Sequence, residues 1–112
     1  MNNQKLLTLT TPYATYKVSL DLDTYADNNR IAVLLTSWES NYAEPFAVIT
    51  VNISDEQISG ANCNFVDINN LPYICKFIEE NNLGTPTHNF GLSGYCAYPE
   101  YQFNLDEIKK YI

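Results

Sequence analysis

Hydrophobic and polar positions alternate along the first half of the chain, which predicts an antiparallel β-sheet. Residues 16–23 alternate between apolar and polar side chains, the period of a half-buried strand, and residues 47–53 largely repeat this pattern. The continuous apolar run at residues 31–35 predicts a more central strand that is covered on both faces. Together with a short strand at residues 6–10, these segments predict a meander of about three or four strands.

In the second half the hydrophobic period becomes that of a helix. Apolar residues at positions 71, 74, 75 and 78 share one face, so a helix is predicted at residues 71–82, ended by Gly84. Residues 98–103 are predicted to form a last strand. Asn104 and Glu107 then have the spacing of a capping box, which predicts a short C-terminal helix.

A helix with one apolar face needs a sheet to cover it, so the two halves are predicted to form a single domain, residues 1–112. Residues 1–66 are the β-rich part, and residues 67–112 contribute the helix, an ordered Gly/Pro/Tyr loop, a strand and the terminal helix. The predicted fold class is α+β: an antiparallel β-sheet of about four to five strands with one main helix and a short C-terminal helix packed on it.

Residues 82–103, which follow the helix and end with the last strand, are predicted to contain a long ordered loop that binds a partner. This stretch contains three of the four glycines and the only histidine of the chain. Tyr98 and Phe90 are expected to pack beneath the loop, and Tyr95 is expected to remain exposed. The candidates for contact with a ligand or partner are Tyr95, Tyr98, Tyr101, His88, Asn89, Ser93 and Glu100.

Residues that carry enzyme chemistry are few, and no catalytic residue is predicted. Cys96 and His88 formally offer a thiol–imidazole pair, but neither the signature of a cysteine hydrolase nor a GxSxG motif is present. The three cysteines include no CxxC pair, so neither a metal site nor a cofactor is predicted. The turn at residues 91–98 offers backbone amides to an anion, so a binder of a nucleotide or another small molecule is the alternative function.

Charge restricts the class of partner. The chain has 6 Lys and Arg against 13 Asp and Glu, a formal net charge of −7, which disfavours direct binding to nucleic acid. An acidic surface favours a basic protein partner, or imitates the charge of nucleic acid. The N-terminal residues lack the apolar core of a signal peptide, and no run is long enough to cross a bilayer. A cytoplasmic protein without membrane contact is therefore expected.

A series of residues within about positions 65–105 has a specific order and spacing: Asp67, Asn69-Asn70, Pro72, Phe77-Ile78, Glu79-Glu80, Leu83-Gly84, Pro86, Ser93-Gly94-Tyr95, Tyr98-Pro99, Tyr101 and Phe103-Asn104. In this series the chain resembles a family of small bacterial proteins, a domain of unknown function, encoded on phages, plasmids and conjugative elements. The resemblance implies a protein of a mobile element that acts in a bacterial host cell. Accessory genes of such elements often encode inhibitors of host defence.

These features predict a small acidic binding protein without enzymatic activity that inhibits a host defence protein such as a nuclease. The basic channel of a nucleic-acid-guided nuclease attracts acidic surfaces, which makes this class of target a natural one. Homodimerisation through an exposed sheet edge is left open by the sequence.

Overall fold

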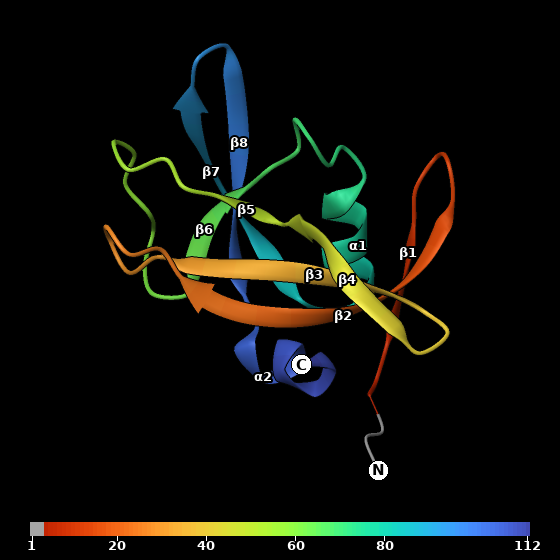
Figure 1. Ribbon diagram of the computed structural model, residues 1–112. Coiled ribbons are helices and arrows are strands. Elements are labelled where there is room, and N and C mark those ends of the chain that lie inside the picture. The colour runs from red at the N-terminus through yellow and green to blue at the C-terminus, as the bar shows by residue number, and fades with distance from the viewer. Residues whose placement is uncertain (1–3) are drawn as a thin grey trace.

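A computed structural model of the chain describes residues 4–112, which contain eight strands in two four-stranded antiparallel sheets (Figure 1). The first sheet has the strand order β1-β2-β3-β4, formed by β1 (Leu7–Thr10), β2 (Thr15–Thr24), β3 (Ile31–Glu39) and β4 (Tyr42–Val48). The second has the order β5-β6-β8-β7, formed by β5 (Thr50–Val51), β6 (Cys63–Val66), β7 (Gly84–Ser93) and β8 (Cys96–Phe103). The helical segments are short: α1 (Ile74–Glu80), α2 (Leu105–Ile108) and the 3₁₀ helix η1 (Lys109–Tyr111).

The chain passes from the first sheet to the second at Ile49. The side chain of Ile49 is fully buried, and its N–H donates to the carbonyl of Val33 at 2.8 Å. Residues 47–53 were predicted as one strand, but they are divided between β4 and β5 because the two sheets meet here. In Figure 1, β7 and β8 of the second sheet run across the direction of β2 and β3.

The main hydrophobic core lies between the first sheet and a layer made of α1, α2 and the C-terminal end of β8. Its buried members include Leu9, Val18, Leu20 and Leu35 from the first sheet, Ile74 and Ile78 from α1, Phe103 from β8 and Ile108 from α2. The alternation predicted for β2 is observed at Val18 and Leu20, which are buried, and at Asp21 and Asp23, which are exposed. Ser19 departs from it, since it is buried and its hydroxyl accepts a hydrogen bond from the indole N–H of Trp38 at 2.8 Å. The side chain of Asn104 caps α2 by accepting a hydrogen bond from the N–H of Glu107 at 3.3 Å, as its position predicted.

The coarse class is confirmed, since the protein is mostly antiparallel sheet with two small helices. The predicted detail of about four to five strands with one main helix was wrong. The predicted strand at residues 98–103 is confirmed within β8, but the residues before it do not form a loop, because most of them belong to β7, which pairs with β8 in a hairpin. The predicted helix at residues 71–82 is reduced to seven residues. Pro86 and an irregularity that follows it in β7 interrupt the period of two, which is why pattern alone did not indicate a strand.

Candidate functional site

The hairpin of β7 and β8 projects beyond the body of the protein (Figure 1). Ser93 pairs with Cys96, and the two residues between them form a tight turn. Gly94, the first residue of this turn, has a φ of +60°, a conformation that glycine adopts without the steric penalty of a side chain. The turn places Tyr95 at the tip, where its side chain is fully exposed.

Residues paired across the hairpin share a face, so its two faces differ sharply. Gly91 and Tyr98 are paired and buried. On the opposite face, Phe90 is 58% exposed and Leu92 is 65% exposed. Their partners are Pro99, which is half-buried, and Ala97, which is exposed, so this face presents a row of apolar side chains that are largely open to solvent. We call it the bare face.

The covered face packs against residues 53–62, a segment that we call the covering loop. Ile53 and Ile58 of this loop join Phe65 and Tyr98 in a second, smaller apolar cluster. The carboxylate of Glu56 accepts a hydrogen bond at 2.8 Å from the N–H of Leu92, which is an edge-strand amide pointing away from β8. The covering loop therefore fixes both the inner face and the outer edge of the hairpin.

Arg30 holds the covering loop to the first sheet. Its guanidinium donates to the carbonyl of Ile53 at 2.8 Å and to that of Glu56 at 2.5 Å. Asp27 also contacts this region, since its carboxylate accepts hydrogen bonds from Ser54 at 2.8 Å and from Asn52 at 3.0 Å. Because both sheets are tied to the loop, the direction in which the hairpin projects is set by the whole fold.

Glu100 on β8 is fully buried, and its carboxylate joins the covering loop to β7. Ser59 donates to it from its backbone N–H at 2.7 Å and from its hydroxyl at 2.5 Å. The hydroxyl of Thr87 donates at 2.5 Å, and the amide of Asn89 lies at 3.5 Å. Burial raises the pKa of Glu100, but the hydrogen bonds from Ser59, Thr87 and Asn89 together outweigh it, so the pKa lies below its ordinary value. Glu100 is therefore ionised near neutral pH.

A bulge in β7 directs these donors toward Glu100. The register shifts between Pro86 and Phe90, and within this interval His88 has a φ of +71°, in the left-handed region. Thr87 and Asn89, on either side of His88, both reach the carboxylate, whereas the side chain of His88 is exposed. At the bulge the regular pairing between β7 and β8 is interrupted. In this conformation Thr87 and Asn89 both reach the buried carboxylate of Glu100.

The predicted contact residues are brought to one hairpin, but they divide between its surface and its interior. Tyr95, Ser93, His88 and Asn89 are exposed, as a contact surface requires. Tyr98, Tyr101 and Glu100 are buried, so they support the hairpin from within, and a direct contact role for them stays a prediction that their burial does not favour. The hydroxyl of Tyr101 donates to Glu79 on α1 at 2.5 Å.

Two exposed residues of the bare face were missed by the sequence reasoning. Tyr98 is buried and Tyr95 exposed as expected, but the expectation that Phe90 packs beneath the loop was wrong. Leu92 was not considered as a contact residue. The signal that indicates both is the position of Gly91 between them: once residues 84–93 are recognised as a strand, Phe90 and Leu92 must share the face opposite to Gly91.

The pair of Cys96 and His88 is not assembled. Cys96 is paired with Ser93 at the tip, and His88 lies five residues before Ser93 on β7. At about 3.3 Å per residue of strand, shortened by the bulge around His88, this separates the two backbones by more than roughly 10 Å, too far for a thiol–imidazole hydrogen bond. Among residues 4–112, no group of three or more His, Cys, Asp or Glu side chains is arranged to hold a metal ion.

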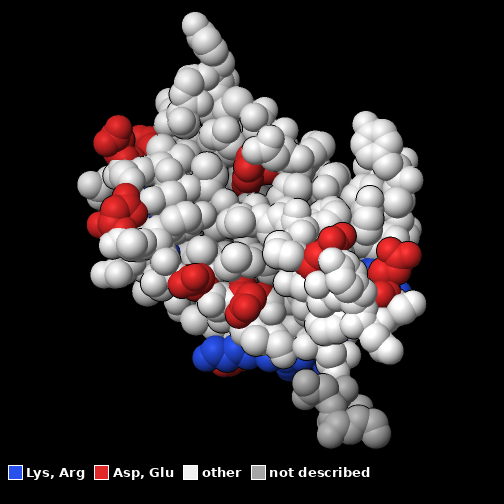
Figure 2. All heavy atoms as spheres, viewed as in Figure 1, with Lys and Arg blue, Asp and Glu red and all other residues white. Residues whose placement is uncertain are grey.

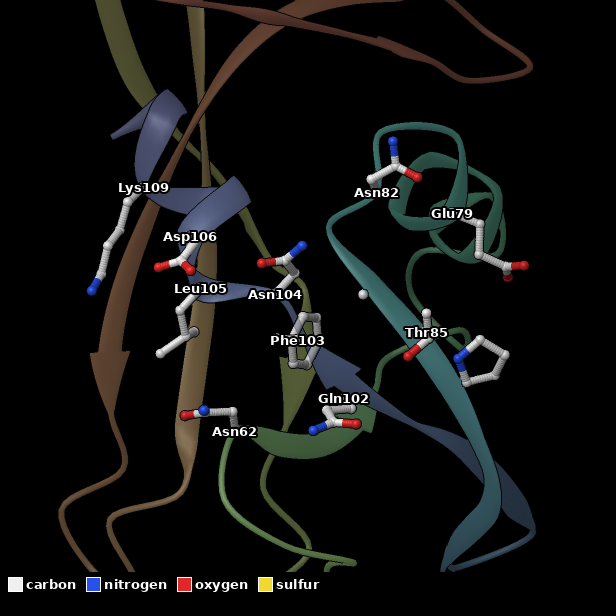
Figure 3. A pocket seen from close by; sticks show the side chains of 12 residues that line it. Asn62, Glu79, Asn82, Thr85, Gln102, Phe103, Asn104, Leu105, Asp106 and Lys109 are labelled. Atoms are coloured by element: carbon white, nitrogen blue, oxygen red, sulfur yellow. The ribbon is translucent and has the colours of Figure 1, made fainter.

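A groove of about 890 Å³ lies near the start of α2, away from the hairpin tip (Figure 3). Figure 3 shows Asn104, Leu105 and Asp106 on one side of Phe103 and Thr85 on the other. Its lining is rich in amides, with Asn62, Asn82, Gln102 and Asn104. A smaller cavity of about 180 Å³ lies between β1 and α1. Neither is lined by residues 91–98, the turn considered for a small ligand.

A family model described as a domain of unknown function (DUF4313) matches residues 19–112. Neither a curated protein nor a solved structure matches the chain. Within residues 4–112, no helix has the length and apolar character needed to span a membrane.

Proposed function

The chain belongs to the DUF4313 family, and we propose that it is a non-enzymatic protein-binding module that contacts its partner with the projecting β7–β8 hairpin. The observation that supports this best is the bare face, where Phe90 and Leu92 are largely exposed beside a fully exposed Tyr95. Contiguous apolar and aromatic groups on a rigid projection are typical of protein contact surfaces. Figure 2 shows this projecting end without charged side chains on the visible face.

The rigidity of the hairpin matters for affinity. Gly91 and Tyr98 pack on Phe65, and the edge of β7 is held by Glu56, so little freedom is lost when a partner binds. Full burial of a Leu or Phe side chain contributes about 1.5–3 kcal/mol. Phe90, Leu92 and Tyr95 together therefore supply on the order of 5 kcal/mol before the costs of association.

The finer part of the proposal rests on the resemblance of residues 65–105 and on the net charge of −7. In it the protein belongs to a mobile element and acts in the bacterial cytoplasm as a stoichiometric inhibitor of a host defence protein, such as a nucleic-acid-guided nuclease. A hairpin that fills a functional cleft of its target inhibits without any chemistry, which agrees with the separation of Cys96 from His88.

Affinity capture from a lysate of the bacterial host tests the contact surface. We expect the variant Phe90→Ser/Leu92→Ser/Tyr95→Ser to lose a partner that the wild-type protein captures, because the three exposed side chains form the contact. The matched control is Tyr13→Ser/Tyr42→Ser, which removes exposed aromatic side chains from the connection between β1 and β2 and from β4, and which should retain the partner. Thermal unfolding of each variant reports on its fold. Retention of the same partner by the triple variant, or capture of none at any salt concentration, would contradict the proposal.

A small-molecule binder is the second candidate, and the groove in Figure 3 is the concave surface that favours it. Its volume of about 890 Å³ is that of a ligand pocket. Binding to the folded state raises the melting temperature by mass action, so a panel of nucleotides tested by thermal shift decides this candidate. A shift abolished by Gln102→Ala would place the ligand in the groove, and one abolished by Tyr95→Ser would place it at the turn. No shift with any nucleotide would remove the nucleotide hypothesis.

A further inference from the structure

The second sheet is free of basic side chains. All six lysine and arginine residues lie outside residues 31–75 and 77–108, and these two ranges contain every strand of the second sheet and the covering loop. The cations lie elsewhere: Lys109 and Lys110 are on η1, and Lys76 pairs with Glu80 on α1. Figure 2 shows no blue side chain on the projecting hairpin, and the largest blue area lies at the opposite end of the molecule.

Carboxylates flank the hairpin where the cations are missing. Glu56 bonds directly to the N–H of Leu92, so its charge lies at the edge of the bare face. Asp55, the preceding residue of the covering loop, is exposed. Arg30, the one arginine of the chain, donates to the carbonyls of Ile53 and Glu56 and so brings one positive charge to the covering loop. The carboxylates of Asp55, Glu56 and Glu100, which bonds to Ser59 of this loop, outnumber it. The hairpin is therefore an apolar projection beside an excess of negative charge.

We propose, on the basis of the function proposed above, that the partner is a basic protein surface with an apolar pocket for Phe90 and Leu92, flanked by lysine or arginine side chains that face Asp55 and Glu56. Complementary charge steers such partners together and excludes others. Nucleic acid and anionic membranes share the sign of this surface and are repelled by it. A second copy of the chain carries the same charge, and the bare face alone is far smaller than the roughly 1,200 Å² that stable interfaces bury.

Two short amphipathic peptides serve as probes: one composed of leucine and lysine, and the same peptide with glutamate in place of lysine. In a titration followed by amide NMR shifts, we expect the lysine peptide to perturb Phe90 and Leu92, with binding that weakens as salt is added. The glutamate peptide should leave these amides unchanged.

Two pairs of charge variants separate the effect on binding of the charge beside the hairpin from the effect of the overall charge of the protein. Asp55→Asn/Glu56→Gln removes two negative charges beside the hairpin, while the amide oxygen of the introduced glutamine is still able to accept from the N–H of Leu92. Asp21→Asn/Asp23→Asn removes the same charge from exposed positions of β2. The first pair should weaken binding of the lysine peptide roughly threefold to tenfold, and the second should change it less than about twofold. Equal effects of the two pairs, or equal binding of both peptides, would overturn the inference.

The outcomes distinguish this inference from the function on which it rests. One possible result is that the hairpin triple variant no longer captures the partner, while added salt and Asp55→Asn/Glu56→Gln leave capture unchanged. The hairpin is then the contact surface, and the inference that the partner surface is basic is wrong. If capture survives the triple variant, the hairpin function itself is wrong, whatever the peptides do.

Discussion

Replacing Glu100 with glutamine is expected to lower the free energy of unfolding by about 2–3 kcal/mol, since hydrogen bonds to a buried ionised group are each worth roughly 1.5–3 kcal/mol and do not add fully. Glutamine has the same shape, but its amide nitrogen is a donor. It would face Ser59 and Thr87, which also donate in the native arrangement. Urea unfolding measures the change, and a shift of the midpoint without a change in slope would identify it as a loss of stability.

A matched control separates the effect of losing the hydrogen bonds to Glu100 from the effect of losing one negative charge. Glu44→Gln makes the same substitution at an exposed position of β4, so its effect should stay within about 0.5 kcal/mol. If the two variants are equally stable, the hydrogen bonds from Ser59, Thr87 and Asn89 contribute nothing net, and the stabilising role of Glu100 is wrong.

The loss of stability in Glu100→Gln is also expected to depend on pH. The pKa of Glu100 is lowered in the folded state, where burial raises it but the hydrogen bonds outweigh burial. The unfolded chain therefore takes up this proton at a higher pH than the folded chain does. The stabilisation is fully present above the ordinary Glu pKa of about 4.3 and is lost as the pH falls through the folded value. We expect the stability difference between wild type and Glu100→Gln to be constant from about pH 6 to 8 and to shrink below about pH 4.

Replacing Gly91 with alanine is expected to lower the free energy of unfolding by about 2 kcal/mol through overpacking. An ideal Cβ at Gly91 would lie 2.8 Å from Cε1 of Phe65, closer than real contacts allow. Phe65 is fully buried among the side chains of the covering loop and Tyr98, so a movement of its ring would have to displace these neighbours. The variant should also weaken partner capture, because the packing of Phe65 sets the position of the bare face.

Two other glycines serve as controls for this prediction. A Cβ at Gly60 meets nothing within 4 Å, so Gly60→Ala should be close to neutral. Gly94 also has open space, but its φ of +60° makes alanine cost roughly 1–2 kcal/mol through the backbone alone. Adding Phe65→Leu should recover part of the loss in Gly91→Ala and none of that in Gly94→Ala. A Gly91→Ala protein as stable as Gly60→Ala would show that Phe65 is not confined.

Regular periodicity made parts of the fold predictable. The alternation of residues 16–23 and the apolar run of residues 31–35 correspond to β2 and β3, because each strand turns one face toward the core along most of its length. Asn104 indicated the start of α2, since capping depends only on residues three positions apart. These features depend on neighbours in the sequence, and sequence patterns report them directly.

The division of the strands between two sheets was not predictable in the same way. Val48, Ile49 and Thr50 have the pattern of the middle of one strand, yet the chain changes sheets among them. In β7, the bulge around His88 exists because Thr87 and Asn89 both bond to Glu100, and Glu100 is buried because Ser59 covers it. Each of these contacts joins residues that lie far apart in the sequence.

The sequence by itself determined the charge of the protein, the absence of lysine and arginine from residues 77–108, the main strands of the first sheet and the exposure of Tyr95 at a glycine turn. Only the tertiary structure decided that Phe90 and Leu92 form a bare face while Tyr98 is covered. The physical reason is that a strand has two equivalent faces until another segment packs on one of them. Here that segment is the covering loop, which comes from about thirty residues earlier in the chain and buries the face that carries Gly91 and Tyr98.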